Sequence, residues 1–76
     1  MPRFFFDTDD GEHVRRDCSG TVLSGREIAK AEAASLLRDL AHGMRLEGSS
    51  VFSCAVRQDD EQPIYRVTMV IEGRSV

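Results

Sequence analysis

The chain has 76 residues, a formal net charge of −3 and hydrophobic residues at 41% of its positions. This length leaves room for one hydrophobic core, so we expect residues 1–76 to form a single domain. No stretch approaches the roughly 20 apolar residues that cross a bilayer, and no secretory signal is recognised, which predicts a cytoplasmic protein. The acidic balance gives no general attraction for nucleic acid or for a membrane surface.

The first two strands are expected to form a hairpin. Three consecutive phenylalanines favour an extended backbone and predict a strand at Arg3–Asp7. Thr8–Gly11 contains the aspartates and the glycine of a turn, so Glu12–Asp17 is predicted to return antiparallel to the first strand. A bend at Cys18–Gly20 and a short extended lead at Thr21–Leu23 then reach the helix.

One amphipathic helix is expected after this lead. Ser24 and Glu27 have the spacing of a capping box, which predicts the start of the helix. Gly43 suits the left-handed position that follows a helix ending near His42. Apolar residues recur between these points at three- and four-residue steps and therefore share one stripe. The stripe consists of Ala29, Ala33, Leu36, Leu37, Leu40 and, if the helix reaches it, Met44.

Two more strands are predicted after the helix. Met44–Ser50 is expected to connect the helix to a third strand at Val51–Gln58. A polar loop at Asp59–Gln62 precedes the fourth strand, Ile64–Ile71, and Pro63 fits only at the beginning of that strand. The order ββαββ predicts an α+β fold in which one helix packs on an antiparallel sheet of about four strands.

Alternation with a period of two assigns each strand residue to one face of the sheet. The face toward the helix is expected to hold Phe4, Phe6, Val14, Phe52, Cys54, Val56, Tyr65, Val67, Met69 and Ile71. One helix covers only one side, so the outer face is expected to be either solvated or used for binding. That outer face collects Arg3, Phe5, His13, Arg15, Ser53, Ala55, Arg57, Arg66, Thr68 and Val70.

Three interpretations of this outer face remain open. Arginine beside an exposed aromatic ring suits contacts with single-stranded bases and phosphates. A solvated face with cross-strand charge pairs, with Asp7 as a local partner, is an alternative. Apolar residues such as Phe5, Ala55, Ile64 and Val70 suit burial in a homodimer. The candidate binding residues are Arg3, Phe5, His13, Arg15, Arg57 and Arg66.

No catalytic or metal-binding motif is found in the sequence. Asp7–Gly11 is similar to the start of a calcium loop, but Gly11 and Cys18 stand where that loop needs ligands. His13 and Cys18 are predicted to point to opposite faces of a strand, too far apart for a catalytic pair. Cys18 and Cys54 lack C-x-x-C spacing and are expected to be free thiols. We therefore expect no enzyme, no cofactor and no metal.

A structural role is expected for Glu32. This residue lies at the edge of the apolar stripe, between Ala31 and Ala33. Its carboxylate is predicted to accept backbone N–H groups from the bend at residues 17–21, which would tie the bend to the helix.

The sequence resembles a family of short uncharacterised bacterial proteins, a domain of unknown function. Its members open with Met-Pro-Arg and a cluster of phenylalanine or tyrosine, have Asp and Gly at a turn, and carry Ala-x-x-Glu-Ala in a helix. The resemblance spans the whole chain and implies a stand-alone bacterial domain with no established activity or cofactor. A fainter similarity of topology is to the small domain of HicB-like antitoxins, which bind a partner protein. The matching positions are Pro2, Arg3, Phe4, Phe5, Phe6, Asp7, Gly11, Asp17, Gly20, Ala29, Glu32 and Ala33.

Two functional hypotheses follow. The first is a non-enzymatic interaction or regulatory module that binds a protein partner or itself, as a homodimer, through its outer sheet face or an exposed strand edge. The alternative is a nucleic-acid-binding module with arginines on phosphates and Phe5 stacked on a base, which predicts binding that weakens steeply with salt.

Overall fold

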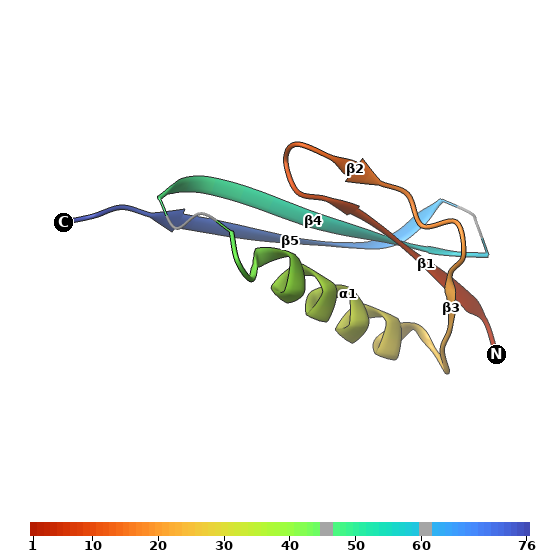
Figure 1. Ribbon diagram of the computed structural model, residues 1–76. Helices are drawn as coiled ribbons and strands as arrows, with labels where there is room; N and C mark the ends of the chain where they lie inside the picture. Colours follow the sequence, from red (N-terminus) through yellow and green to blue (C-terminus); the bar gives the residue numbers. More distant parts are fainter. Residues whose placement is uncertain (45–46, 60–61) are drawn as a thin grey trace.

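The computed structural model describes residues 1–44, 47–59 and 62–76. One helix, α1, packs on one face of an antiparallel five-stranded sheet (Figure 1). The strands run in the order β2-β1-β4-β5, and β3 also pairs with β1. The predicted α+β fold is confirmed, with the extended lead before the helix forming an additional strand. The elements are β1 (Arg3–Asp9), β2 (Val14–Arg15), β3 (Thr21–Val22), α1 (Arg26–Ala41), β4 (Gly48–Gln58) and β5 (Pro63–Gly73).

The hydrophobic core lies between α1 and the centre of the sheet. Ala29, Ala33 and Leu37 recur four residues apart on α1 and are buried, as the stripe predicts. The short alanine side chains let the helix approach the sheet closely, where Phe4 and Phe52 fill the space. Phe6, Cys54 and Val56 complete the buried cluster, whereas Cys18 is exposed.

The two ends of α1 compare differently with the prediction. The prediction of a capping box is wrong, because Gly25 is the N-cap and no side chain caps this end of the helix. Leu23 still donates its N–H to the carbonyl oxygen of Pro2, which prolongs the pairing of β3 and delays the start of the helix. The C-terminal prediction is confirmed, because the helix ends at Ala41 and Gly43 has a φ of +85°. No helix within the described residues is long and apolar enough to span a membrane.

The loop of the first hairpin lies further along the chain than predicted. β1 continues to Asp9, and residues 10–13 form the loop in place of Thr8–Gly11. The reason is local: Asp10 Oδ1 accepts the N–H of Glu12 at 2.9 Å and the N–H of His13 at 2.7 Å. These bonds fix a turn around the Asp10 side chain.

The two faces of β2 are the reverse of the predicted ones. Thr8 is paired with Arg15 and Asp9 with Val14, and paired residues share a face. A four-residue loop at residues 8–11 would also place Val14 on the outer face, opposite Phe5, so the predicted assignment followed the apolar character of Val14 and not the pairing. Val14 is 76% exposed, so its predicted contact with the helix is wrong, and Arg15 lies on the helix side.

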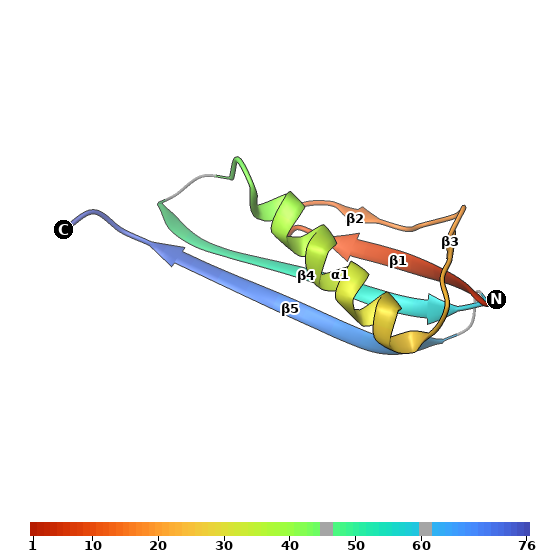
Figure 2. The ribbon, with the colours of Figure 1, turned by 90° about the horizontal axis from the view of Figure 1, so that it is seen from below.

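β4 and β5 form a long hairpin. β4 begins at Gly48, inside the predicted connection Met44–Ser50, and β5 continues past Ile71 to Gly73. Figure 2 shows this hairpin projecting beyond the C-terminal end of α1, and the molecule measures 49 × 21 × 18 Å. Residues 45–46 of the predicted connection and residues 60–61 of the predicted polar loop lie outside the described residues.

Candidate interaction surfaces

Asp7, Asp17 and Arg57, which we call the Arg57 cluster, connect β1, β4 and the segment between β2 and β3. Arg57 donates from Nε to Asp7 Oδ2 at 2.7 Å and from Nη2 to Asp7 Oδ1 at 3.0 Å. Nη2 also donates to the carbonyl oxygen of Asp17 at 2.9 Å, and the N–H of Asp17 donates to Asp7 Oδ1 at 2.9 Å. Arg57 is only 3% exposed, so this two-pronged ion pair compensates a buried charge.

The side chain of Asp17 fills a gap in the pairing of β1. β2 pairs with residues 8–9 of β1 and β3 with residues 3–4, which leaves Phe6 between them. The N–H of Phe6 donates to Asp17 Oδ2 at 3.1 Å. Asp17 Oδ1 accepts the N–H of Ser19 at 3.1 Å and the N–H of Gly20 at 3.0 Å. The carboxylate therefore occupies the place that a carbonyl oxygen of a neighbouring strand would take.

Hydrogen bonding keeps both carboxyl groups of the Arg57 cluster ionised. The pKa of Asp7 is lowered from its ordinary value of 3.8, chiefly because Arg57 donates hydrogen bonds to it. Burial alone would raise the pKa of Asp17, but the N–H donors of Gly20, Phe6 and Ser19 outweigh burial, and this pKa is also lowered. The folded chain thus favours the anionic form of both residues more than the unfolded chain does.

Phe5 packs against Arg57 on the outer face. The guanidinium carbon of Arg57 lies 4.9 Å from the centroid of the Phe5 ring, a cation–π distance. Gly20 approaches the same ring, since a Cβ on Gly20 would lie 2.8 Å from Phe5 Cε2. Residues of the same chain therefore cover this part of the outer face. The expectation that Arg57 is available at the surface is wrong, whereas the suggested charge pair with Asp7 is confirmed.

The other four candidate binding residues lie at three separate places, because only His13 and Arg15 line the same small cavity. Arg3 is exposed and donates from Nη1 to the carbonyl oxygen of Ser19 at 2.9 Å. Arg15 is exposed on the helix side of β2, and His13 is exposed in the loop before it. Arg66 is exposed on β5, toward the other edge of the sheet. The six residues do not form one surface, and their role in binding stays a prediction.

Asp17 is the residue whose role sequence reasoning missed. The bend at residues 17–21 was expected to be held by Glu32, but Glu32 is exposed and Asp17 accepts the N–H groups of the bend itself. Asp17-Cys18-Ser19-Gly20 has a signal for this role. An aspartate side chain often accepts the backbone N–H groups of the residues two and three positions after it, and these bonds form a turn.

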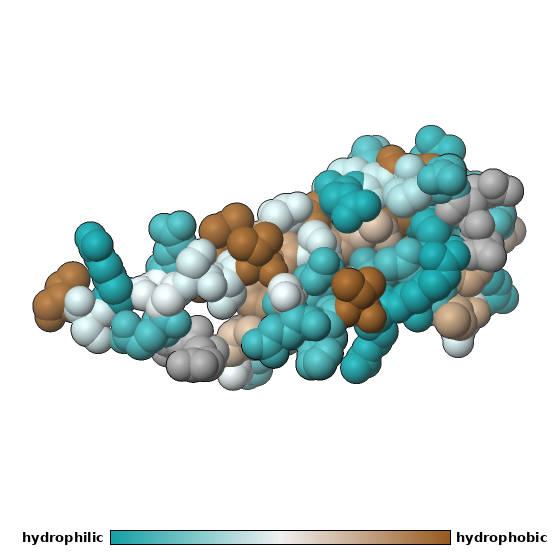
Figure 3. Space-filling model, turned by 90° about the horizontal axis from the view of Figure 1, so that it is seen from above, coloured by the Kyte–Doolittle hydropathy of each residue, from teal (hydrophilic) through white to brown (hydrophobic). Residues whose placement is uncertain are grey.

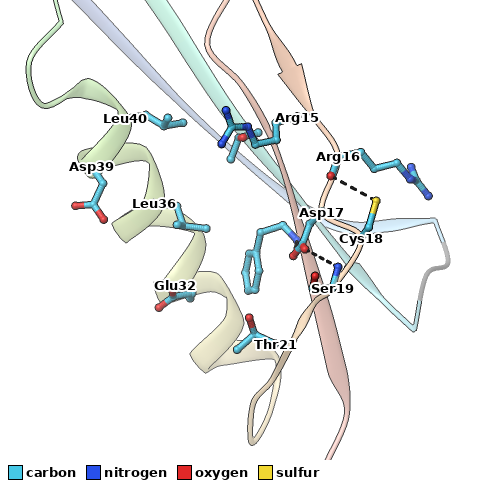
Figure 4. Close-up of a pocket in the computed structure, with 12 residues that line it drawn as sticks. Arg15, Arg16, Asp17, Cys18, Ser19, Thr21, Glu32, Leu36, Asp39 and Leu40 are labelled. Carbon is cyan, nitrogen blue, oxygen red and sulfur yellow. Dashed lines mark hydrogen bonds between the residues drawn. The ribbon is translucent and has the colours of Figure 1, made fainter.

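A groove of about 590 Å³ lies between α1 and the segment from β2 to β3 (Figure 4). Leu36 and Leu40 point from α1 toward the strands, whereas Arg16 and Cys18 point away from the helix. The Cys18 thiol donates to the carbonyl oxygen of Arg16 at 3.8 Å, and no metal-binding group of side chains is found among the described residues. The charged side chains at the groove carry both signs: Arg15, Arg16, Asp17, Glu32 and Asp39.

The second edge of the sheet is formed by β5 alone. Within the described ranges, β5 pairs with β4 on one side and with no segment on the other (Figure 2). This strand has 11 residues, of which only Arg66 and Glu72 are charged. On the face away from α1, Val70 is 58% exposed beside its 50% exposed partner Val51. Figure 3 shows apolar side chains exposed on this face of the hairpin.

Comparison with known proteins yields one finding. The sequence model of a family described as a domain of unknown function, DUF6894, matches residues 3–70. This match agrees with the resemblance to a family of short uncharacterised proteins. No curated protein and no solved structure matches the chain.

Proposed function

Because the chain belongs to the DUF6894 family of domains of unknown function, we propose from its geometry that it is a non-enzymatic protein-interaction module of the bacterial cytoplasm. Its contact surface is the open edge of β5, to which a partner adds an extended strand. One observation carries this proposal: an 11-residue strand presents one whole side of its backbone without a covering segment in the described part of the chain.

An uncovered strand edge offers a row of backbone donors and acceptors to another chain. Natural proteins block such edges with short strands, inward-pointing charges, prolines or bulges. β5 has its proline at its first residue, Pro63, and its only register shift against β4 lies near that end, between Val56 and Arg57. The remainder of β5 has no further proline or register shift and only two charged residues, Arg66 and Glu72, which supports its use as a binding edge.

The surroundings of Arg57 weaken the nucleic-acid alternative. Its Nε and Nη2 groups donate to Asp7 and Asp17, and its guanidinium covers the ring of Phe5. A base stacked on Phe5 has to displace this buried ion pair first, which is costly. The net charge of −3 adds no long-range attraction for phosphates.

The test compares edge variants at the two sides of the sheet. An affinity-tagged chain and an untagged copy are expressed together in cells of the source organism, and the retained polypeptides are identified by mass spectrometry. Thr68→Lys/Val70→Lys places charges on the exposed face of β5, and Val14→Lys places one on β2 as the matched control. We expect at least one polypeptide to be retained by the unmodified chain and by the control and lost from the β5 variant. Retention that ignores the β5 substitutions contradicts the proposal.

A further inference from the structure

The side chains of β5 form a pattern that complements itself. Arg66, Thr68, Val70 and Glu72 lie on the outer face, because Arg66 is paired with Ala55 and Val70 with Val51 on that face. Tyr65, Val67, Met69 and Ile71 lie on the helix side and are partly buried. Met69 stands midway between the two charged residues, so reversing the direction of the strand about Met69 exchanges Arg66 with Glu72.

We propose that β5 pairs antiparallel with β5 of a second copy of this chain, with Met69 opposite Met69 of the copy. This inference rests on the proposed function, since it names the partner of the same open edge. Arg66 of each chain then lies opposite Glu72 of the other, so the dimer gains two cross-strand charge pairs. Val67 lies opposite Ile71 of the copy on the helix side, where both residues continue the apolar face.

Symmetry restricts the registers that two identical edges can adopt. An antiparallel pair of identical strands is related by a two-fold axis perpendicular to the sheet, so both copies of α1 lie on the same side. Paired residues must then share a face. Each allowed register is therefore centred on one residue of β5, which lies opposite itself in the copy, and the next register is centred on the neighbouring residue. Centring the pair on Val70 places Arg66 opposite the copy's Arg74, and centring it on Thr68 places Arg66 opposite Val70. The register centred on Met69 is the one that pairs Arg66 with Glu72.

Both charged residues are available for this pairing. Arg66 and Glu72 are exposed, and within residues 1–44, 47–59 and 62–76 neither has an ion pair or a hydrogen-bonded side-chain partner. A continuous sheet through two copies also gives the outward backbone groups of β5 the hydrogen bonds that an isolated edge leaves to water. Charge complementarity and symmetry thus commit the edge to a second copy.

The experiment exploits the exchange of charges between copies. Light scattering on the purified chain at micromolar concentration should give twice the 8.5 kDa mass of one chain. Arg66→Glu alone places Glu opposite Glu72 of the copy, and Glu72→Arg alone places Arg opposite Arg66, so each variant should dimerise at least about tenfold more weakly. Mixing the two variants restores both opposite-charge pairs and should restore the dimer. Arg38→Glu, at an exposed position on α1, is the control and should leave the mass unchanged.

Each contrary outcome has a distinct meaning. A dimer that survives both single substitutions, or a mixture that stays monomeric, overturns the register. The chain is also measured at about 100 times the micromolar concentration used above. If it is still monomeric there, while its β5 edge retains a different polypeptide in cells, self-pairing is overturned and the interaction function stands. A monomeric chain that retains no polypeptide through β5 overturns both proposals. Circular dichroism confirms that each exposed-site variant is folded.

Discussion

The two edges of the sheet are treated in opposite ways by the sequence. The β1 edge is covered by the short strands β2 and β3, and the carboxylate of Asp17 fills the gap between them. The β5 edge is longer and has no covering segment among the described residues. Covering an edge thus requires specific residues, here Asp17, Gly20 and the Arg57 cluster. The absence of such devices along β5 is what makes it the candidate contact surface.

The largest expected effect comes from removing the charge of Arg57. Arg57→Met leaves Asp7 half-buried without its ion-pair partner, and we expect the free energy of unfolding to fall by about 3 kcal/mol. Urea titration followed by circular dichroism measures this loss. Arg74→Met changes an exposed arginine in the C-terminal tail and should cost less than about 0.5 kcal/mol. Equal losses in the two variants would show that the Arg57 cluster does not hold the β1 edge.

Asp17→Ala is expected to have the second-largest effect on stability, because it loosens the segment between β2 and β3 from β1. The variant leaves the N–H groups of Phe6 and Gly20 without their acceptor, with an expected loss of about 2 kcal/mol. Amide hydrogen exchange gives the sharper readout, because the Phe6 N–H should exchange much faster. Asp10→Ala removes an equivalent acceptor at the exposed hairpin loop and should leave the Phe6 exchange rate unchanged. A protected Phe6 N–H in Asp17→Ala would contradict the proposed role.

Acid should loosen the same edge without any substitution. The pKa values of Asp7 and Asp17 are lower in the folded chain than in the unfolded chain, so the unfolded state binds more protons. The stabilisation is fully present above the unfolded value of 3.8, and it is lost as pH falls toward the lower folded values. The effect should be smaller than that of Asp17→Ala, since a protonated carboxyl group keeps its place. Urea midpoints are measured from pH 6 to pH 2, about the range in which such groups titrate. They should fall less with pH in Asp17→Asn than in the unmodified chain, because the variant has one fewer carboxyl group to protonate.

Gly20 provides the most local test, and the expected difference between its variant and a control is the smallest of these effects. Gly20→Ala and Gly43→Ala both place a side chain at positive φ, and both should lose about 1 kcal/mol from backbone strain. At Gly20 the new Cβ also meets Arg3 Cγ and Phe5 Cε2 at 2.8 Å, whereas nothing lies within 4 Å at Gly43. The Gly20 variant should therefore be less stable than the Gly43 variant by about a further 1 kcal/mol. Thermal unfolding of the pair gives this difference directly, and equal melting temperatures would remove Gly20 from the cover of β1.

Regular elements were predictable because they repeat. The four-residue spacing of Ala29, Ala33 and Leu37 identified the buried side of α1, and alternation placed Phe4 and Phe52 in the core. The position of a hairpin loop is less constrained, since it depends on which aspartate side chain the N–H groups reach. The predicted faces of Val14 and Arg15 came from their hydrophobicity, and their pairing with Asp9 and Thr8 reverses both.

The residues at the candidate surfaces were harder to predict for a different reason. Arg57 was assigned to the outer face, but its burial depends on Asp17, which is 40 residues away in sequence. No local pattern reports such a contact. The faces of β5 followed from alternation, whereas its place at the edge of the sheet depends on the strand order β2-β1-β4-β5, which periodicity does not specify.

The burial of Cys54 gives this protein a built-in chemical reporter. Loss of solvent raises the pKa of this thiol to about 11, so at neutral pH it is both protonated and inaccessible to alkylating reagents. Cys18 is exposed and reacts without any opening of the fold. Mass spectrometry of a timed iodoacetamide reaction therefore separates a prompt first adduct from a slow second one. The slow rate measures how often strand β4 comes away from the helix.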